Sequence, residues 1–132
     1  MEKPRTDRRP EQVVADFFEF FNAADRDSLN AVWDSPCVFI TGSQTKQFDR
    51  YADAVSFQKL KEEGWSYSRI HSSELVFEEE TLAMVKFDFS RFDESDKVIA
   101  TYDVTHLLVK KDNRWRIKVL YLTGSKSMSG IT

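Results

Sequence analysis

The C-terminal half of the chain contains two long strand-like segments joined by the dipeptide Asp112-Asn113, and this feature constrains the fold most. Segments 97–110 and 114–124 are rich in β-branched and aromatic residues, which favour strands. Aspartate and asparagine both tolerate the left-handed backbone of a two-residue hairpin turn. We therefore predict an antiparallel hairpin, extended into a sheet by strand-like segments at 65–78 and 81–92.

A two-residue loop fixes the register of the hairpin and hence the face on which each side chain lies. Leu108 is then expected opposite Ile117, and His106 opposite Val119. An even-numbered turn before residue 97 places strand 81–92 in the same alternation. The face best suited to the core carries Tyr102, Val104, His106, Leu108, Trp115, Ile117, Val119, Tyr121 and Thr123, together with Ala83, Val85, Phe87, Phe89 and Arg91.

The opposite face of this sheet is too apolar at one end to be exposed comfortably to solvent. Its apolar side chains are Leu82, Met84, Leu107, Val109, Leu120 and Leu122. We therefore expect this outer face to form a homodimer interface.

The register of the strand at 65–78 stays open because the acidic turn that follows it has no defined length. A two-residue turn directs Ile70 and Val76 inward. An odd-numbered turn instead directs inward Arg69, His71, Leu75 and Phe77. The face occupied by His71 is therefore not assigned.

The N-terminal half is predicted to be mainly helical. From Pro10 to about Ala24, apolar residues recur at helical spacing, led by Phe17, Phe18 and Phe21, which indicates a helix covered on more than one side. Further elements expected along the chain are a short helix at 28–33 with Asp27 as N-cap, a strand at 37–41, a loop at 42–46, and a third helix capped by Asp49 and ended by Gly64.

Length and charge indicate one domain that binds neither nucleic acid nor membranes. Residues 10–124 are expected to form it, between a flexible N-terminal tail at 1–9 and a frayed C-terminal tail at 125–132. The 19 Lys and Arg against 22 Asp and Glu form no basic stripe, and no apolar run approaches the roughly 20 residues of a membrane helix. Cys37 is the single cysteine, so no intrachain disulfide is possible, and we expect a cytoplasmic protein.

The order of helices followed by a curved antiparallel sheet, closing with DVTHLLVKKDNRWRIKVLYLTGS, resembles the NTF2-like superfamily and its SnoaL-like members. The similarity extends over about residues 10–124 and is most specific at Thr105, the 110–113 turn, Trp115 and Ile117. It implies an α+β cone in which three N-terminal helices pack on the curved sheet. Because the turn and the tryptophan are structural, the pattern says little about chemistry.

Such a cone implies a pocket for a small, largely apolar molecule, bounded by the inner face of the sheet. The catalytic candidate is His106, whose ordinary pKa of about 6.5 suits proton transfer. Candidate ligand-binding residues are Tyr102, Tyr121, Arg91, Phe87 and Trp33. Each has a purely structural alternative: a hydrogen-bonded core histidine, tyrosines packed with satisfied hydroxyls, and a rim salt bridge of Arg91 with Glu74 or Asp93.

The nearest enzymatic template within the superfamily, ketosteroid isomerase, does not fit at its working positions. Where a tyrosine would be needed, the first helix has Phe17 and Phe18, and the strand at 37–40 lacks an aspartate. Asp103 is expected on the face opposite His106. We expect no metal and no cofactor, because two histidines without a third ligand at suitable spacing do not form a zinc site.

Two functions are therefore compatible with the sequence. The first is a domain that binds a small apolar molecule and carries out isomerase, cyclase or dehydratase chemistry through His106. The second is a non-catalytic homodimeric association or scaffolding domain that acts through its outer sheet face.

Overall fold

The computed structural model describes residues 8–42, 44–123 and 128–131. A six-stranded sheet has the order β2-β1-β6-β5-β4-β3. Its strands are β1 (Trp33–Thr41), β2 (Gln44–Phe48), β3 (Tyr67–Glu78), β4 (Leu82–Phe92), β5 (Val98–Lys111) and β6 (Arg114–Leu122). The helices are α1 (Pro10–Asn22), α2 (Arg26–Val32), α3 (Tyr51–Ala54) and α4 (Phe57–Glu62).

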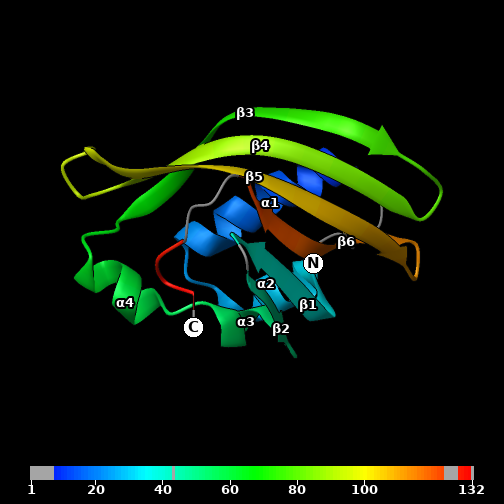
Figure 1. Cartoon of the computed structure of the whole chain (residues 1–132), viewed down its shortest axis with the longest axis horizontal. Helices are drawn as coiled ribbons and strands as arrows, with labels where there is room; N and C mark the ends of the chain where they lie inside the picture. The colour runs from blue at the N-terminus through cyan, green and yellow to red at the C-terminus, as the bar shows by residue number, and fades with distance from the viewer. Residues whose placement is uncertain (1–7, 43, 124–127, 132) are drawn as a thin grey trace, which may run out of the picture.

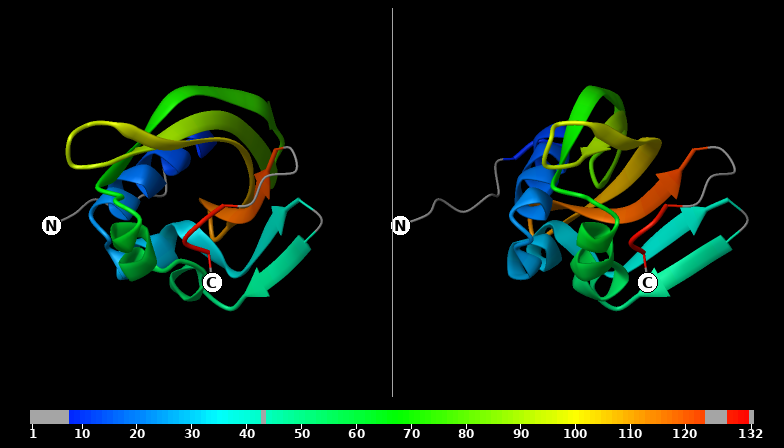
Figure 2. Two further views of the ribbon diagram at one scale, coloured as in Figure 1. Left: turned by 60° about the vertical axis from the view of Figure 1, so that its left-hand side comes forward. Right: turned by 90° about the vertical axis from the view of Figure 1, so that its left-hand side faces the viewer.

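The sheet curves around helix α1 and gives the fold its cone shape. Strands β3, β4 and β5 arch over α1 (Figure 1), and the turned views show that the sheet encloses the helix on its concave side (Figure 2). Helix α1 packs against β3, β4 and β6. This α+β arrangement confirms the fold class predicted from the sequence.

The apolar stripe of α1 explains why this helix fills the cone. Its buried side chains include Val13, Val14, Phe17, Phe18 and Phe21, so the predicted helix is confirmed. Burying large aromatic side chains is worth roughly 1.5–3 kcal/mol each before entropic costs. The helix is therefore the central element of the core rather than a peripheral cover.

Several boundaries differ from those expected. Helix α2 begins at Arg26 because Asp25, and not Asp27, accepts a hydrogen bond from the Ser28 backbone N–H at 3.2 Å. The third predicted helix is divided into α3 and α4, and Ser56 caps α4. Gly64 follows α4 with φ +96°, as its place in the sequence predicts.

Of the loop expected at 42–46, residues 44–46 belong to strand β2, and residue 43 lies outside the described part of the chain. This strand pairs antiparallel with β1, and β1 in turn pairs parallel with β6. The expectation of a loop was wrong because the polar segment QTKQF lies at a sheet edge, where its backbone pairs on one side and its side chains stay mostly exposed.

The β5–β6 hairpin has the predicted two-residue turn, but the predicted register is lost in the middle of β6. Asp112 and Asn113 have φ values of 52° and 62°, and Leu108 lies opposite Ile117. A β-bulge then leaves Lys118 as an extra residue. Its ammonium group donates to the carbonyl oxygen of Pro36 at 2.6 Å, which ties the bulge to β1.

Beyond the bulge, the two faces of β6 are the reverse of those predicted. Leu107 lies opposite Val119, and His106 opposite Leu120. Leu120 consequently lies on the inner face, and Tyr121 lies on the outer face, where 44% of it is exposed. A β-bulge adds one residue to one strand only, which shifts the alternation of all residues that follow.

Strand β3 satisfies neither of the two registers considered, because it contains two irregularities against β4. One lies between Ile70 and Ser72 and the other between Leu75 and Phe77. Ile70 is paired with Phe89 and Leu75 with Val85, so both lie on the inner face. His71 lies on the outer face, where its Nε2 is 2.6 Å from Ser90 Oγ.

Candidate functional site

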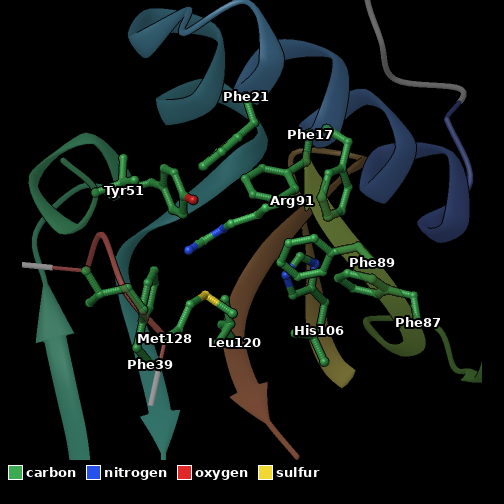
Figure 3. Close-up of a pocket in the computed structure, with 14 residues that line it drawn as sticks. Phe17, Phe21, Phe39, Tyr51, Phe87, Phe89, Arg91, His106, Leu120 and Met128 are labelled. Carbon is green, nitrogen blue, oxygen red and sulfur yellow. The ribbon is translucent and has the colours of Figure 1, made fainter. Parts of the chain in front are cut away.

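A pocket lies between α1, the concave face of the sheet and residues 128–131 (Figure 3). Most of its wall is aromatic: Phe17, Phe18, Phe21, Phe39, Tyr51, Phe87 and Phe89. The cavity measures about 30 Å³ on the scale on which roughly 10–15 Å³ holds one water molecule. The pocket is thus small and chemically suited to apolar groups.

His106 contributes a polar group to this wall but forms no hydrogen bond with the described residues. It is fully buried, and neither ring nitrogen has a hydrogen-bond partner within the described part of the chain. Aromatic rings meet it edge-on, with ring centroids at 4.8 Å for Phe87, 5.3 Å for Trp33 and 5.6 Å for Phe17. Burial lowers the pKa of His106 to about 3, so the imidazole is neutral at neutral pH.

Arg91 is the charged residue of the pocket wall, and only 4% of it is exposed. Its Nη1 donates to the carbonyl oxygen of Ser129 at 2.9 Å and to the Ser129 hydroxyl at 3.0 Å. The guanidinium carbon lies 5.0 Å from the centre of the Tyr102 ring. Burial lowers the pKa of Arg91, but a guanidinium keeps its proton in proteins, so the pocket contains a positive charge.

Figure 3 shows the Arg91 guanidinium pointing into the pocket, near the hydroxyl of Tyr51 and beside Met128. His106 lies on the other side of the guanidinium, next to Phe87. The two polar groups come from neighbouring strands, β4 and β5. Together with Tyr51 they give an otherwise apolar cavity several groups that can form hydrogen bonds.

Of the predicted site residues, Phe87, Arg91 and His106 line the pocket. Tyr102 lies beneath Arg91 and outside the wall, and the expected rim salt bridge of Arg91 is replaced by its bonds to Ser129. Trp33 is buried behind the wall, where its ring stacks on Tyr51 at 4.7 Å. Tyr121 was placed on the wrong face and does not contribute to the pocket.

Sequence reasoning missed the contribution of the C-terminal residues. Met128 and Ile131 line the pocket, Ile131 forms a β-bridge with Val55, and the Ser56 N–H donates to the Gly130 carbonyl oxygen at 2.8 Å. For residues 128–131, the expected frayed tail is therefore wrong. Residues 125–127 and 132 lie outside the described part of the chain.

Tyr51 was also missed as a pocket residue. It is buried, and Figure 3 shows its hydroxyl in the pocket. The single helix predicted here breaks after Ala54. The sequence contains no proline or glycine at that point to mark it.

Other candidate reactive groups are engaged elsewhere. Asp34 is bound by Lys111 at 2.8 Å and Lys118 at 3.1 Å. Burial alone would raise the pKa of Asp34, but hydrogen bonds from these lysines hold it below its ordinary value. Burial raises the pKa of Cys37 to about 11, so its thiol is not a ready nucleophile.

Within the described ranges, no His, Cys, Asp and Glu side chains gather in a group of three or more that could hold a metal ion. The same ranges contain no helix that is both long and apolar enough to span a membrane. Among the residues that the structure describes, no carboxylate lines the pocket. The chemistry available at the site is therefore hydrogen bonding by neutral groups and attraction by one guanidinium.

The curved sheet, the helix inside it and the pocket between them define an NTF2-like fold. The chain belongs to the family of NTF2-like proteins called DUF6841, whose model matches residues 8–124. No curated protein sequence is similar enough to match the chain.

Solved structures share this fold at low sequence identity. A protein of unknown function with a cystatin-like fold from Nostoc punctiforme superposes with a TM-score of 0.70 at 11% identity, covering 92% of this chain and 93% of that one. An NTF2-like protein of unknown function from Shewanella oneidensis has a TM-score of 0.66 at 18% identity, with coverages of 85% and 93%. A provisionally assigned ketosteroid isomerase from Shewanella frigidimarina has a TM-score of 0.67 at 14% identity, with coverages of 89% and 97%.

Proposed function

We propose that this domain binds a small, largely apolar molecule in the aromatic pocket and holds it by a hydrogen bond to neutral His106. The observation that carries the proposal is that a fully buried imidazole has no hydrogen-bond partner on either nitrogen among the described residues. Leaving a buried polar group unsatisfied costs about 1–3 kcal/mol. A ligand with one hydroxyl or carbonyl group would supply the missing partner.

Binding is supported better than acid–base catalysis. A general base works best when its pKa lies near the working pH, whereas the pKa of His106 is lowered to about 3. Isomerase, cyclase or dehydratase chemistry would also need a second proton-transfer group beside the substrate, and no carboxylate lines the pocket in the described part of the chain. We therefore assign His106 the role of a binding residue.

The test uses a neutral probe with an apolar body, 4-phenylbutanol, followed by NMR of the leucine and valine methyl groups. We expect saturable shifts at Val104 and Leu120, which line the pocket. Leu120→Phe should fill the cavity and weaken binding at least about tenfold, or about 1.4 kcal/mol. Val119→Phe is the matched control, because it adds the same ring to the neighbouring residue on the outer face.

Shifts confined to surface methyl groups would contradict the proposal, as would equal losses of affinity in the two variants. If Leu120→Phe bound the probe with the affinity of the wild type, the binding site would lie elsewhere. Each of these outcomes can be read without knowing the natural ligand.

We also propose that the domain forms a homodimer through its outer sheet face, because an apolar row crosses that face. The row consists of residues that lie opposite one another on successive strands: Phe77, Met84, Leu107, Val119 and Val38. Tyr121 and Leu82 beside it are 44% and 37% exposed. The five residues of the row are themselves half-buried, and a contiguous apolar patch that stays partly open to solvent is typical of protein interfaces.

The occupant we propose for this outer apolar row is a second copy of the chain, since a symmetric dimer needs only one self-complementary patch. In this role the domain would act as an association module, with or without a ligand. Sedimentation equilibrium of the wild-type protein tests it. We expect a dimer at about 10 μM, and a monomer at about 1 mM would contradict the proposal.

A further inference from the structure

The positive charge of Arg91 is buried, and the described residues contribute no counter-ion to it. Among the described residues, no Asp or Glu forms an ion pair with it, although the residue is only 4% exposed. Glu63 influences it only through longer-range attraction. Buried charges in proteins are normally paired, because removing an ion from water is costly. The arrangement is therefore incomplete without a negative group.

The guanidinium also retains unused hydrogen-bond donors. A guanidinium has five N–H groups, and Nη1 uses its own two on Ser129. The Nε atom is buried without a partner, and no hydrogen bond from Nη2 to a described residue is found. Nε and Nη2 form one edge of the guanidinium, and this edge matches the two oxygens of a carboxylate.

We propose that the ligand of this pocket is a small carboxylic acid with an apolar body, its carboxylate paired with the free edge of Arg91. This inference rests on the proposed binding function and adds the chemical class of the ligand. One guanidinium matches the single charge of a carboxylate, and the lining contributes no further cationic side chain in the described part of the chain. The aromatic wall takes the apolar body.

Residues 128–131 determine how such a ligand enters. They hold Arg91 from one side through Ser129, and Met128 and Ile131 cover the adjacent space. The cavity of about 30 Å³ is too small to enclose a molecule of several carbon atoms, and we infer that these residues move outward when the acid binds. Figure 2 shows this segment at the C-terminus, beside α4 and at the edge of the fold.

The experiment compares 4-phenylbutyrate with 4-phenylbutanol, which share a carbon skeleton and differ in the acid group. Dissociation constants are measured by NMR at pH 7 for the wild type and for Arg91→Met. Lys86→Met is the matched control, since it removes one positive charge from the same strand at an exposed position. Addition of the acid should also shift the Arg91 Nε–H signal of the wild type, whereas the alcohol should not.

We expect the wild type and Lys86→Met to bind the acid at least about tenfold more tightly than the alcohol. In Arg91→Met this preference should disappear, while affinity for the alcohol changes less than about threefold. If Arg91→Met does not fold, the wild-type preference and the Nε–H signal decide the matter.

Equal affinities of the wild type for acid and alcohol would overturn the ligand class and leave the proposed binding function standing. A preference that persists in Arg91→Met would show that another group attracts the anion. The weakest binding that would support the proposed function has a Kd of about 1 mM. If neither probe binds at a concentration of about 10 mM, the proposed binding function fails and this inference fails with it.

Discussion

The two faces of the curved sheet have opposite deficiencies. The concave face is covered by α1 and sealed by aromatic rings, yet it contains polar groups of His106 and Arg91 that have no partner in the described chain. The convex face leaves a half-buried apolar row without cover in the described chain. The concave face therefore lacks hydrogen-bond partners for two buried polar side chains, and the convex face lacks an apolar covering layer.

The comparison teaches that a single pair of strands presents two chemically different surfaces, for which we have proposed two different binding partners. Successive residues of a strand point to opposite faces, so Leu120 lines the pocket while Tyr121 lies outside it. A substitution on one face should consequently leave the other intact. The predictions below test that independence.

The largest effect is expected from Leu107→Glu, at the centre of the outer apolar row. Twofold symmetry would bring two buried carboxylates into one interface, which should weaken dimerisation by more than about a thousandfold, or about 4 kcal/mol. Sedimentation equilibrium measures the change. Ser95→Glu adds the same charge in the exposed β4–β5 turn and should leave the dimer unchanged. Both variants should bind 4-phenylbutanol with the affinity of the wild type.

The next largest effect is a loss of stability in acid, which we expect from protonation of His106 on the concave face. Below pH 6.5 the unfolded chain gains a proton on His106, whereas the folded protein resists protonation until about pH 3. Stability therefore falls as the pH is lowered through this window, by up to about 1.4 kcal/mol per pH unit and by about 3 kcal/mol from pH 6.5 to pH 4.

Urea unfolding at several pH values measures this loss. His106→Leu should lack the component, whereas His71→Leu, which removes the histidine of the outer face, should retain it. Parallel pH curves for His106→Leu and the wild type would contradict a neutral buried imidazole.

An intermediate effect is expected where residues 128–131 close the pocket. A Cβ added at Gly130 would lie 2.6 Å from Leu60 Cδ2, and the backbone there has φ +86°. Gly130→Ala should therefore detach the segment and accelerate hydrogen exchange of the Ser56 N–H about 30-fold, equivalent to about 2 kcal/mol. Gly64→Ala is the control, because its φ is similarly positive and its Cβ meets nothing within 4 Å. An unchanged exchange rate of the Ser56 N–H in Gly130→Ala would contradict the proposed clash with Leu60.

The smallest effect is a gain of stability. At pH 7, His106→Leu replaces an unsatisfied buried imidazole by an apolar side chain and should raise the free energy of unfolding by about 1 kcal/mol. The same variant should bind 4-phenylbutanol more weakly, since the hydrogen bond is lost. A variant that is both less stable and unchanged in binding would show that His106 has a structural role.

Sequence patterns were sufficient for the elements with strong periodicity and insufficient where strands depart from regular pairing. The phenylalanine stripe of α1 and the Asp112-Asn113 turn predicted a long helix and a hairpin, and both are present. Period-two alternation also placed His106 and Arg91 on the inner face. Nothing local in the sequence marks the bulge at Lys118, because it is stabilised by contacts with Pro36 of a distant strand.

The site was predicted in the same uneven way. The predicted site residues on β4 and β5 were placed on the correct face. Tyr121, which follows the bulge in β6, was not. Residues 128–131 combine two apolar residues, Met128 and Ile131, with Ser129 and Gly130 and show no periodicity, so their packing on Leu60 and Val55 depends on the shape of the cone. Tertiary contacts of this kind cannot be inferred from composition.

The bulge at Lys118 also affects how relatives of this chain should be aligned. A relative whose corresponding strand is regular needs one residue fewer between Ile117 and Leu120 to present the same inner side chains. An alignment without a gap there would equate pocket residues of one protein with surface residues of the other. Comparisons of ligand specificity across the family therefore depend on placing that single gap at the bulge.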